Sequence, residues 1–108
     1  MSVFLIADIK VTDDRWIPDY AANVHEIVSK HGGKYLARSG NITNIEGDPL
    51  DSTLIAIVEF PSLEACQGFM SSKEYEPFAK TRQAGSVSRF NVIDDTDIAG
   101  STPYLKKN

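Results

Sequence analysis

The sequence predicts an α+β fold in which a four-stranded antiparallel sheet carries helices on one face. Two observations support this fold class. Segments with strand and helix character follow one another in the order strand, helix, strand, strand, helix, strand. The 108 residues, of which 42% are hydrophobic and 24% charged, have the size and composition of one ordinary globular domain. We therefore expect a single domain over residues 1–93 and a polar C-terminal tail over residues 94–108.

The four predicted strands are apolar segments that are rich in β-branched residues and are bounded by turn-forming residues. They cover Val3–Val11, Lys34–Ile45, Thr53–Phe60 and Ser86–Ile93. The second and third strands are separated by residues 46–52, which are mostly turn formers. A connection this short favours an antiparallel hairpin.

The first predicted helix lies between the first two strands. Its apolar and aromatic residues recur at spacings of three and four, which is the pattern of an amphipathic helix. These residues are Trp16, Tyr20, Val24, Ile27, Val28 and His31. Pro18 fits only the first turn, so the helix should begin near Ile17, and Gly32 and Gly33 should end it.

The second helical region follows the third strand and opens at Ser62. Its apolar stripe consists of Leu63, Cys66, Phe69 and Met70. Residues 71–74 fit a capping box, which predicts a break and then a new helical turn that ends at Gly85. The new turn carries Tyr75, Phe78 and Arg82.

This order of elements is that of the ferredoxin-like βαββαβ fold, with the first and third strands in the middle of the sheet. Because side chains alternate across a strand, each strand contributes one set of residues to each face. One set is almost wholly apolar and should lie beneath the helices. The other set mixes charges with large apolar groups, which are Phe4, Ile6, Leu36, Ile55, Ile57 and Val87.

The apolar residues of the open face form a patch of a kind that is uncommon on monomeric proteins. A second copy of the chain is the simplest partner to cover such a patch. We therefore expect a homodimer in which two sheets meet face to face. The alternative is a monomer whose sheet has an apolar outer face.

Charged residues on the same face need partners. If the hairpin turns between Asp48 and Pro49, Arg38 lies opposite Glu59, while Asp8 and Arg89 share their orientation on the other strands. These charges either form a salt-bridge network within a dimer or line a polar pocket for an anion or a carbonyl compound. The residues alone leave both interpretations open.

If a small-molecule site exists, six residues are its candidates. Arg38, Arg82, Arg89 and Asp8 would bind the substrate, and Glu59 and Tyr75 would be catalytic. Arginines can hold a carboxylate or enolate in a planar fork, a glutamate among apolar neighbours can shuttle protons, and a tyrosine can donate to a carbonyl oxygen. The plainer alternatives are that the Tyr75 ring packs in the core and that Arg82 packs its stem while its head reaches solvent.

Several classes of function are excluded. His25 and His31 lie on different faces of one helix, and Cys66 is the single cysteine, so we expect neither a metal site nor a cofactor. The net charge of −4 and an open face of aliphatic and acidic residues argue against nucleic acid. No apolar run approaches the roughly 20 residues of a membrane span. We expect a cytoplasmic protein.

Four short segments resemble the domain-of-unknown-function 1330 family. They are residues 31–38 (His-Gly-Gly-Lys-Tyr-Leu-Ala-Arg), 46–48, 57–62 and 72–77, and they keep the order and spacing of that family. The resemblance implies the dimeric α+β barrel superfamily, whose members pair their sheets across a two-fold axis. Monooxygenase-like, isomerase-like and dehalogenase-like relatives bind small organic molecules between sheet and helices, and the family itself has no agreed reaction.

Three functions are therefore considered. The leading one is a homodimeric small-molecule protein, which could be a cofactor-free enzyme acting on an activated carbonyl or enolisable compound. The second is a non-catalytic ligand-binding or regulatory module, and the third is a purely structural dimerisation domain. The tail is either mobile or docks on a neighbouring subunit through Ile98, Pro103, Tyr104 and Leu105.

Overall fold

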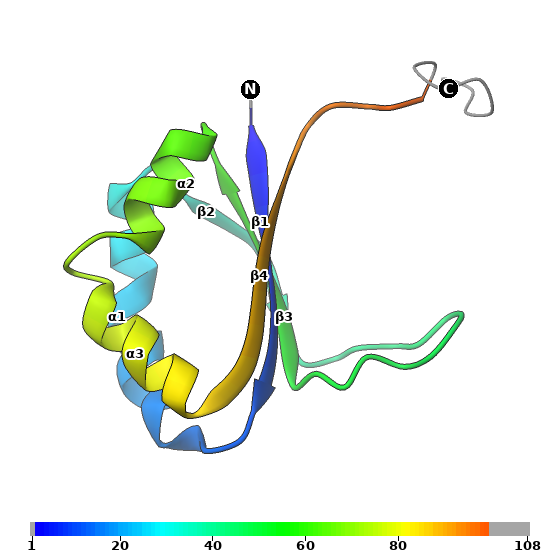
Figure 1. The fold of residues 1–108 in the computed structure, drawn as a ribbon, viewed down its shortest axis with the longest axis horizontal. Helices are drawn as coiled ribbons and strands as arrows, with labels where there is room; N and C mark the ends of the chain where they lie inside the picture. The colour runs from blue at the N-terminus through cyan, green and yellow to red at the C-terminus, as the bar shows by residue number, and fades with distance from the viewer. Residues whose placement is uncertain (1, 100–108) are drawn as a thin grey trace.

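The computed structural model describes residues 2–99 and has two layers, with the helices on one face of the sheet (Figure 1). The elements are β1 Val3–Val11, a 3₁₀ turn η1 Asp14–Trp16, α1 Ile17–Lys30, β2 Lys34–Ser39, β3 Leu54–Phe60, α2 Leu63–Met70, α3 Glu76–Ala84 and β4 Ser86–Asp94. The predicted α+β fold class is confirmed. Most of the tail that the sequence analysis singled out, residues 100–108, lies outside the described residues.

The sheet is antiparallel throughout and has the order β2-β3-β1-β4. The first and third strands are central, as the ferredoxin-like topology predicts. Helix boundaries also follow the sequence signals, since Ser62 caps α2 by accepting from the Ala65 amide and Ser72 accepts from the Tyr75 amide before α3. Within residues 2–99, no helix is both long enough and apolar enough to cross a membrane.

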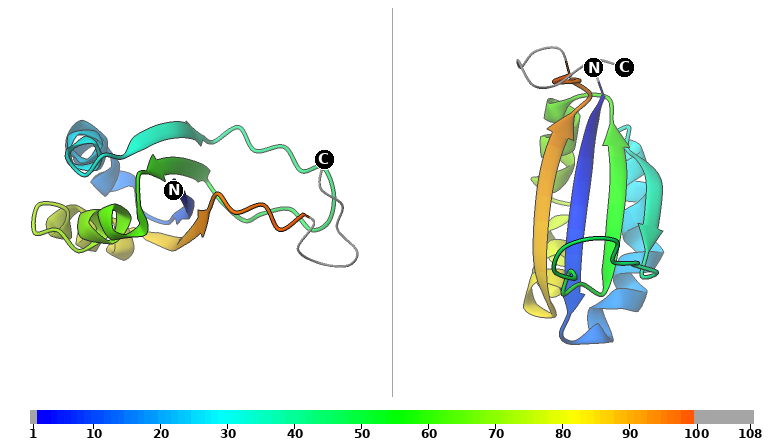
Figure 2. Two further views of the ribbon diagram at one scale, coloured as in Figure 1. Left: turned by 90° about the horizontal axis from the view of Figure 1, so that it is seen from above. Right: turned by 90° about the vertical axis from the view of Figure 1, so that its right-hand side faces the viewer.

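The second strand is shorter than the sequence predicts. It ends at Ser39 rather than at Ile45, and residues 40–53 form a long loop that projects from the sheet on the side away from the helices (Figure 2). Within the loop, the Asn44 side-chain amide donates to the Gly47 carbonyl, and at its end Asp51 and Thr53 bond to Lys10 and Val11 of β1. Gly47 itself has a φ of +78°, which a strand cannot accommodate.

A β-bulge changes the pairing of β2 with β3. Lys34 lies opposite Glu59, but after the irregularity around Leu36 the partner of Arg38 is Ala56. The extra residue reverses the alternation of side chains, so Arg38 faces the helices. The expected cross-strand pair of Arg38 with Glu59 on the open face is therefore wrong.

The core fills the space between the layers. Its largest cluster of buried residues is Val3, Leu5, Val24, Ile27, Val28, Val58, Phe60, Cys66, Phe69 and Tyr75. A second cluster, built around Trp16 and Ile9, closes the end of the sheet where β1 leaves it. The Trp16 indole donates to the Gly85 carbonyl over 3.1 Å, which ties the start of α1 to the start of β4.

We predict that Gly85→Ala destabilises the fold. A Cβ atom at this position would lie 2.4 Å from Cδ1 of Trp16 and 2.7 Å from the Asp13 carbonyl oxygen. Relieving such overpacking should cost about 1–3 kcal/mol of unfolding free energy, measured by urea denaturation. Gly68→Ala is the matched control, because its Cβ would meet no atom closer than 3.6 Å and alanine is the better helix former. Equal stability of the two variants would contradict this packing.

Candidate functional site

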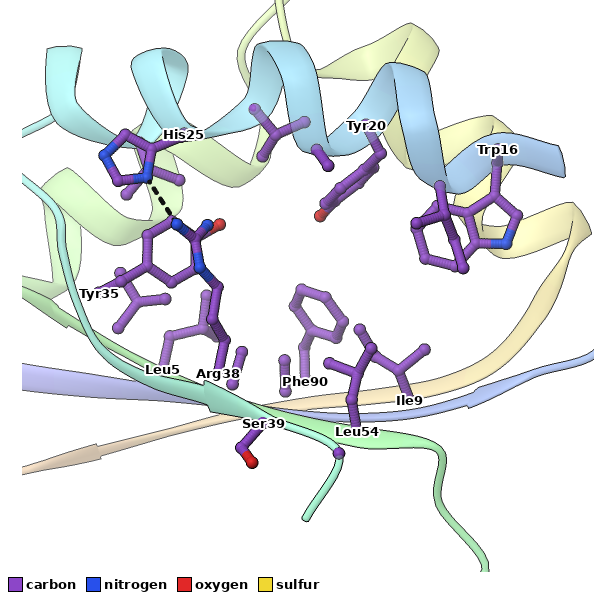
Figure 3. Close-up of a pocket in the computed structure, with 18 of the residues that line it drawn as sticks. Leu5, Ile9, Trp16, Tyr20, His25, Tyr35, Arg38, Ser39, Leu54 and Phe90 are labelled. Atoms are coloured by element: carbon purple, nitrogen blue, oxygen red, sulfur yellow. Dashed lines mark hydrogen bonds between the residues drawn. The ribbon is translucent and has the colours of Figure 1, made fainter. Parts of the chain in front are cut away.

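A cavity of about 300 Å³ lies between α1 and the helix-facing side of the sheet (Figure 3). Leu5, Ala7 and Ile9 of β1 form its floor together with Phe90 of β4. The alternation that buries these β1 residues under the helices also directs them into the cavity. The remaining lining residues are Trp16, Ile17, Tyr20, Ala21, Val24, His25, Val28, Tyr35, Arg38, Ser39, Gly40, Leu54, Ala56, Val58 and Phe69.

The walls are mostly apolar, and the polar groups are few. His25, Tyr35 and Arg38 gather at one end, and Tyr20 reaches down from α1 with its oxygen toward the interior (Figure 3). The Ser39 hydroxyl points away from the cavity. An apolar cavity with a few convergent polar groups is the usual form of a small-molecule site.

Arg38 is held against two rings. Its guanidinium carbon lies 4.2 Å from the centre of the Tyr35 ring, and its Nη2 lies 3.2 Å from Nδ1 of His25. The His25 ring stacks on Tyr35 with 5.4 Å between the ring centres. Because a guanidinium only donates, this contact requires Nδ1 of His25 to accept and its proton to sit on Nε2.

The charge of Arg38 has no acidic partner. Among the ion pairs formed by residues 2–99, none includes Arg38, although five involve other lysines and arginines. Arg38 is exposed, so it lies where the cavity opens to solvent, and the N–H groups that do not bond to His25 or Tyr35 can reach an anionic or carbonyl group there. Burial raises the pKa of Tyr35, and the Arg38 charge only partly opposes this, so the phenol stays protonated.

Behind the cavity, Tyr20 contacts a buried pair formed by Tyr75 and Arg82. The two phenol oxygens are 2.6 Å apart, and Nε of Arg82 donates to the Tyr75 oxygen over 3.3 Å. Tyr75 is 0% exposed and Arg82 is 2% exposed. The Arg82 guanidinium also lies 4.2 Å above the Phe90 ring. The interpretation in which the head of Arg82 reaches solvent is therefore wrong, because α3 packs it against the sheet.

The other predicted site residues lie on the opposite face of the sheet. Asp8 pairs with Arg89 across β1 and β4, with 2.5 Å between the charged groups, and also accepts from the Ser52 hydroxyl. Glu59 lies opposite Phe4, on that same open face. The structure thus places only Arg38 in the cavity, Tyr75 and Arg82 behind it, and Asp8, Arg89 and Glu59 away from it. The roles assigned to these six residues stay predictions.

The family model for the domain of unknown function DUF1330 matches residues 2–96. The chain belongs to the DUF1330 family. No curated protein matches this DUF1330 chain in sequence. The segments that resembled this family in the sequence lie within the matched residues, so the resemblance is confirmed.

Solved structures of similar fold share little sequence with this DUF1330 protein. A protein of unknown function from Rhodopseudomonas palustris has a TM-score of 0.73 and 16% identity, covering 89% of this chain and 83% of that one. SnoaB, a cofactor-independent oxygenase from Streptomyces nogalater, has a TM-score of 0.62 and 13% identity, covering 89% and 94%. An antibiotic biosynthesis monooxygenase has a TM-score of 0.57 and 14% identity, covering 90% and 100%. The fold is that of dimeric α+β barrel proteins, and proteins with this fold are often dimeric.

Sequence reasoning missed Tyr20, His25 and Tyr35 as cavity residues. Tyr20 belongs to the apolar stripe of the first helix, which predicts a core position rather than a cavity wall. His25 was considered only as a metal ligand. One signal was present, since an amphipathic helix with several aromatic residues near its start can leave a gap against small residues such as Ala7 and Ala56.

The described residues offer no metal centre in this DUF1330 protein. Within residues 2–99, no three side chains of histidine, cysteine, aspartate or glutamate gather in a group that could hold a metal ion. Cys66 is buried in the core, and that burial raises the pKa of its thiol, which makes it a poor nucleophile. The expected absence of metals and cofactors stays a prediction.

We predict that Asp8→Asn weakens the fold near neutral pH and has no effect in acid. The Ser52 hydroxyl, and after it Arg89, lowers the pKa of Asp8 below its ordinary value. A lowered pKa stabilises the folded state above the ordinary value, and this contribution is lost as the pH falls through the pKa of the folded state. We expect a loss of about 1 kcal/mol at about pH 7 that shrinks as the pH falls below the ordinary carboxyl pKa of about 3.9, measured by urea denaturation. Asp48→Asn, in the exposed loop, is the control, and an equal loss in both variants would contradict the pairing.

Proposed function

We propose that this DUF1330 chain forms a homodimer in which each subunit binds a small, mostly apolar organic molecule that carries an anionic or carbonyl group. The observation that carries the proposal is the apolar cavity with Arg38 at one end and no acidic partner for its charge. A cation without an acidic partner beside an apolar cavity favours a ligand with matching chemistry.

The size and lining of the cavity limit the class of ligand. About 300 Å³ is at the lower end of the range of small-molecule pockets, so the ligand should be compact. Aliphatic and aromatic walls favour a ring or an alkyl body. The free N–H groups of Arg38 can hold a carboxylate or enolate oxygen in a planar fork, and the Tyr35 ring and His25 fix the direction of that fork.

The open face of the sheet supports the dimer. Phe4, Ile6 and Ile57 project from the central strands on this face, and Val87 and Ile93 of β4 are 62% and 56% exposed. No helix covers these residues, while the loop 40–53 and residues 95–99 extend from the same side as two arms (Figures 1 and 2). A second copy of the sheet would bury the apolar residues between these arms.

A catalytic function is the second candidate. It would act on an activated carbonyl or enolisable compound without a cofactor. The observation that favours it is the partly buried hydroxyl of Tyr20 at the cavity, which could donate to a reacting oxygen. The fold similarity to SnoaB, a cofactor-independent oxygenase, is consistent with such chemistry. A cytoplasmic setting without nucleic-acid or membrane partners belongs to the proposal and is supported by the net charge of −4.

We predict that small aromatic carboxylates, with 2-naphthoate as the first probe, raise the melting temperature of the wild-type protein. A ligand that binds only the folded state must do so. Arg38→Gln should weaken binding about ten- to a hundredfold, since a hydrogen bond to a charged group contributes about 1.5–3 kcal/mol. Arg89→Gln, on the open face, is the matched control and should bind like the wild type. Equal binding by the two variants, or no response of the wild type to any acid, would show the proposal to be wrong.

We predict that Ile57→Arg produces a folded monomer. The change places a charge in the middle of the open face, where a facing sheet could not solvate it, but leaves the core beneath the helices intact. Sedimentation velocity should then detect the loss of the dimer, with an unchanged circular dichroism spectrum. Leu63→Arg changes an exposed leucine on α2 and should remain dimeric. A wild-type chain that sediments as a monomer at micromolar concentration would refute the dimer.

A further inference from the structure

Tyr20 contacts both the cavity and the buried core. Its ring lines the cavity, and its hydroxyl lies 2.6 Å from the hydroxyl of Tyr75, which is fully buried. The Trp16 ring packs edge-on against Tyr20 with 5.2 Å between the ring centres, and the Tyr75 ring does so at 6.0 Å. These contacts hold the Tyr20 hydroxyl in one position.

Arg82 and the burial of Tyr75 together favour one direction for these hydrogen bonds. A guanidinium can only donate, so the Tyr75 oxygen accepts from Nε of Arg82. The bond between the two phenols can run in either direction. We infer that Tyr75 donates to Tyr20, because Tyr75 is fully buried and its proton has no other acceptor among the hydrogen bonds of residues 2–99, whereas the Tyr20 proton can reach the cavity. The Tyr20 proton is left without an acceptor among the hydrogen bonds of the described residues. It is free to point into the cavity.

Arg82, which ends this series of hydrogen bonds, carries a buried charge. Arg82 is 2% exposed, and none of the ion pairs within residues 2–99 includes it. Burial of a cation without an acidic partner is costly, and contacts with the Phe90 ring and the Tyr75 oxygen offset part of this cost. Its positive charge polarises the two hydroxyl groups toward the cavity.

We propose that Tyr20 donates a hydrogen bond to a carbonyl or enolate oxygen of the molecule bound in the cavity, and that Tyr75 and Arg82 are positioning residues that orient and polarise this donor. The inference rests on the proposed function and narrows it, because it names the oxygen function that the ligand must carry. With Arg38 at the other polar site, the favoured ligand has two acceptors, an anionic group and a carbonyl, on one apolar body.

Tyr20 acts in this scheme as a donor and not as a base. Burial raises the pKa of Tyr20 far above its ordinary value. The hydroxyl therefore keeps its proton at every physiological pH. The Tyr20 donor would stabilise an oxygen that gains negative charge during a reaction more than it stabilises a neutral carbonyl oxygen. A donor raises a reaction rate only when it binds the transition state more strongly than the ground state.

Two ligands of matched shape test the inference. 2-Acetonaphthone has a carbonyl oxygen where 2-isopropenylnaphthalene has a methylene group, so the ratio of their dissociation constants isolates the contribution of the oxygen. In Tyr20→Phe the ratio should shift about tenfold against the ketone, while the affinity for the alkene stays as in the wild type. Tyr75→Phe should give an intermediate shift. For each variant, isothermal titration calorimetry measures four dissociation constants, those of the two ligands for the wild type and for the variant.

Infrared spectroscopy of the bound ketone provides the second readout. A hydrogen bond from Tyr20 should lower the carbonyl stretching frequency in the wild type relative to Tyr20→Phe, an effect that a merely structural role would not produce. If the band in the wild type coincides with that of the ketone in a hydrocarbon solvent, Tyr20 makes no such bond, and this holds even if the variant fails to fold.

The outcomes separate the two levels of the proposal. Equal ratios in the wild type and Tyr20→Phe would overturn the role of Tyr20 and leave the cavity as a binding site. A Tyr75→Phe variant with the ratio and the infrared band of the wild type would overturn the positioning role of Tyr75 and Arg82. If neither ligand binds the wild type although 2-naphthoate does, this inference fails and the proposed function stands. If 2-naphthoate does not bind either, the proposed function fails, and this inference fails with it.

Discussion

One extra residue in β2 decides which face of the sheet carries the candidate site. The bulge around Leu36 turns Arg38 from the open face to the helix face, where it meets His25 and the ring of Tyr35. Without the bulge, the guanidinium would join the other charges on the open face. With it, an unpaired cation faces an apolar cavity, and the rest of the functional proposal depends on that juxtaposition.

Charged residues on the two faces of the sheet have different kinds of partner. On the open face, Asp8 and Arg89 form an ion pair across neighbouring strands. On the helix face, Arg38 and Arg82 both lack carboxylate partners in the described part of the chain and rest on aromatic rings instead. Paired charges suit a structural surface, whereas unpaired cations beside a cavity suit recognition of an oxygen-bearing ligand.

The order of elements, the helix boundaries and the apolar floor of the cavity could be predicted from the sequence, because each depends on local periodicity or on a capping residue. The bulge could not, since an added residue within a run such as Tyr35, Leu36 and Ala37 leaves no mark in the hydrophobic pattern. The loop 40–53 was predicted only in part, because Ile42 and Ile45 extend the apolar pattern while their backbone turns away from the sheet. The cavity was missed because periodicity indicates which residues face the sheet and not how far α1 stands from it.

The orientation of Arg38 is the claim that can be tested most directly, by nuclear Overhauser effects in the wild-type protein without any ligand. The structure predicts contacts from the side-chain protons of Arg38 to the ring protons of Tyr35 and His25. Contacts from Arg38 to Glu59 and Ile57 instead would mean that β2 pairs without the bulge, that the cation lies on the open face, and that the cavity has no charged group to recognise an anion.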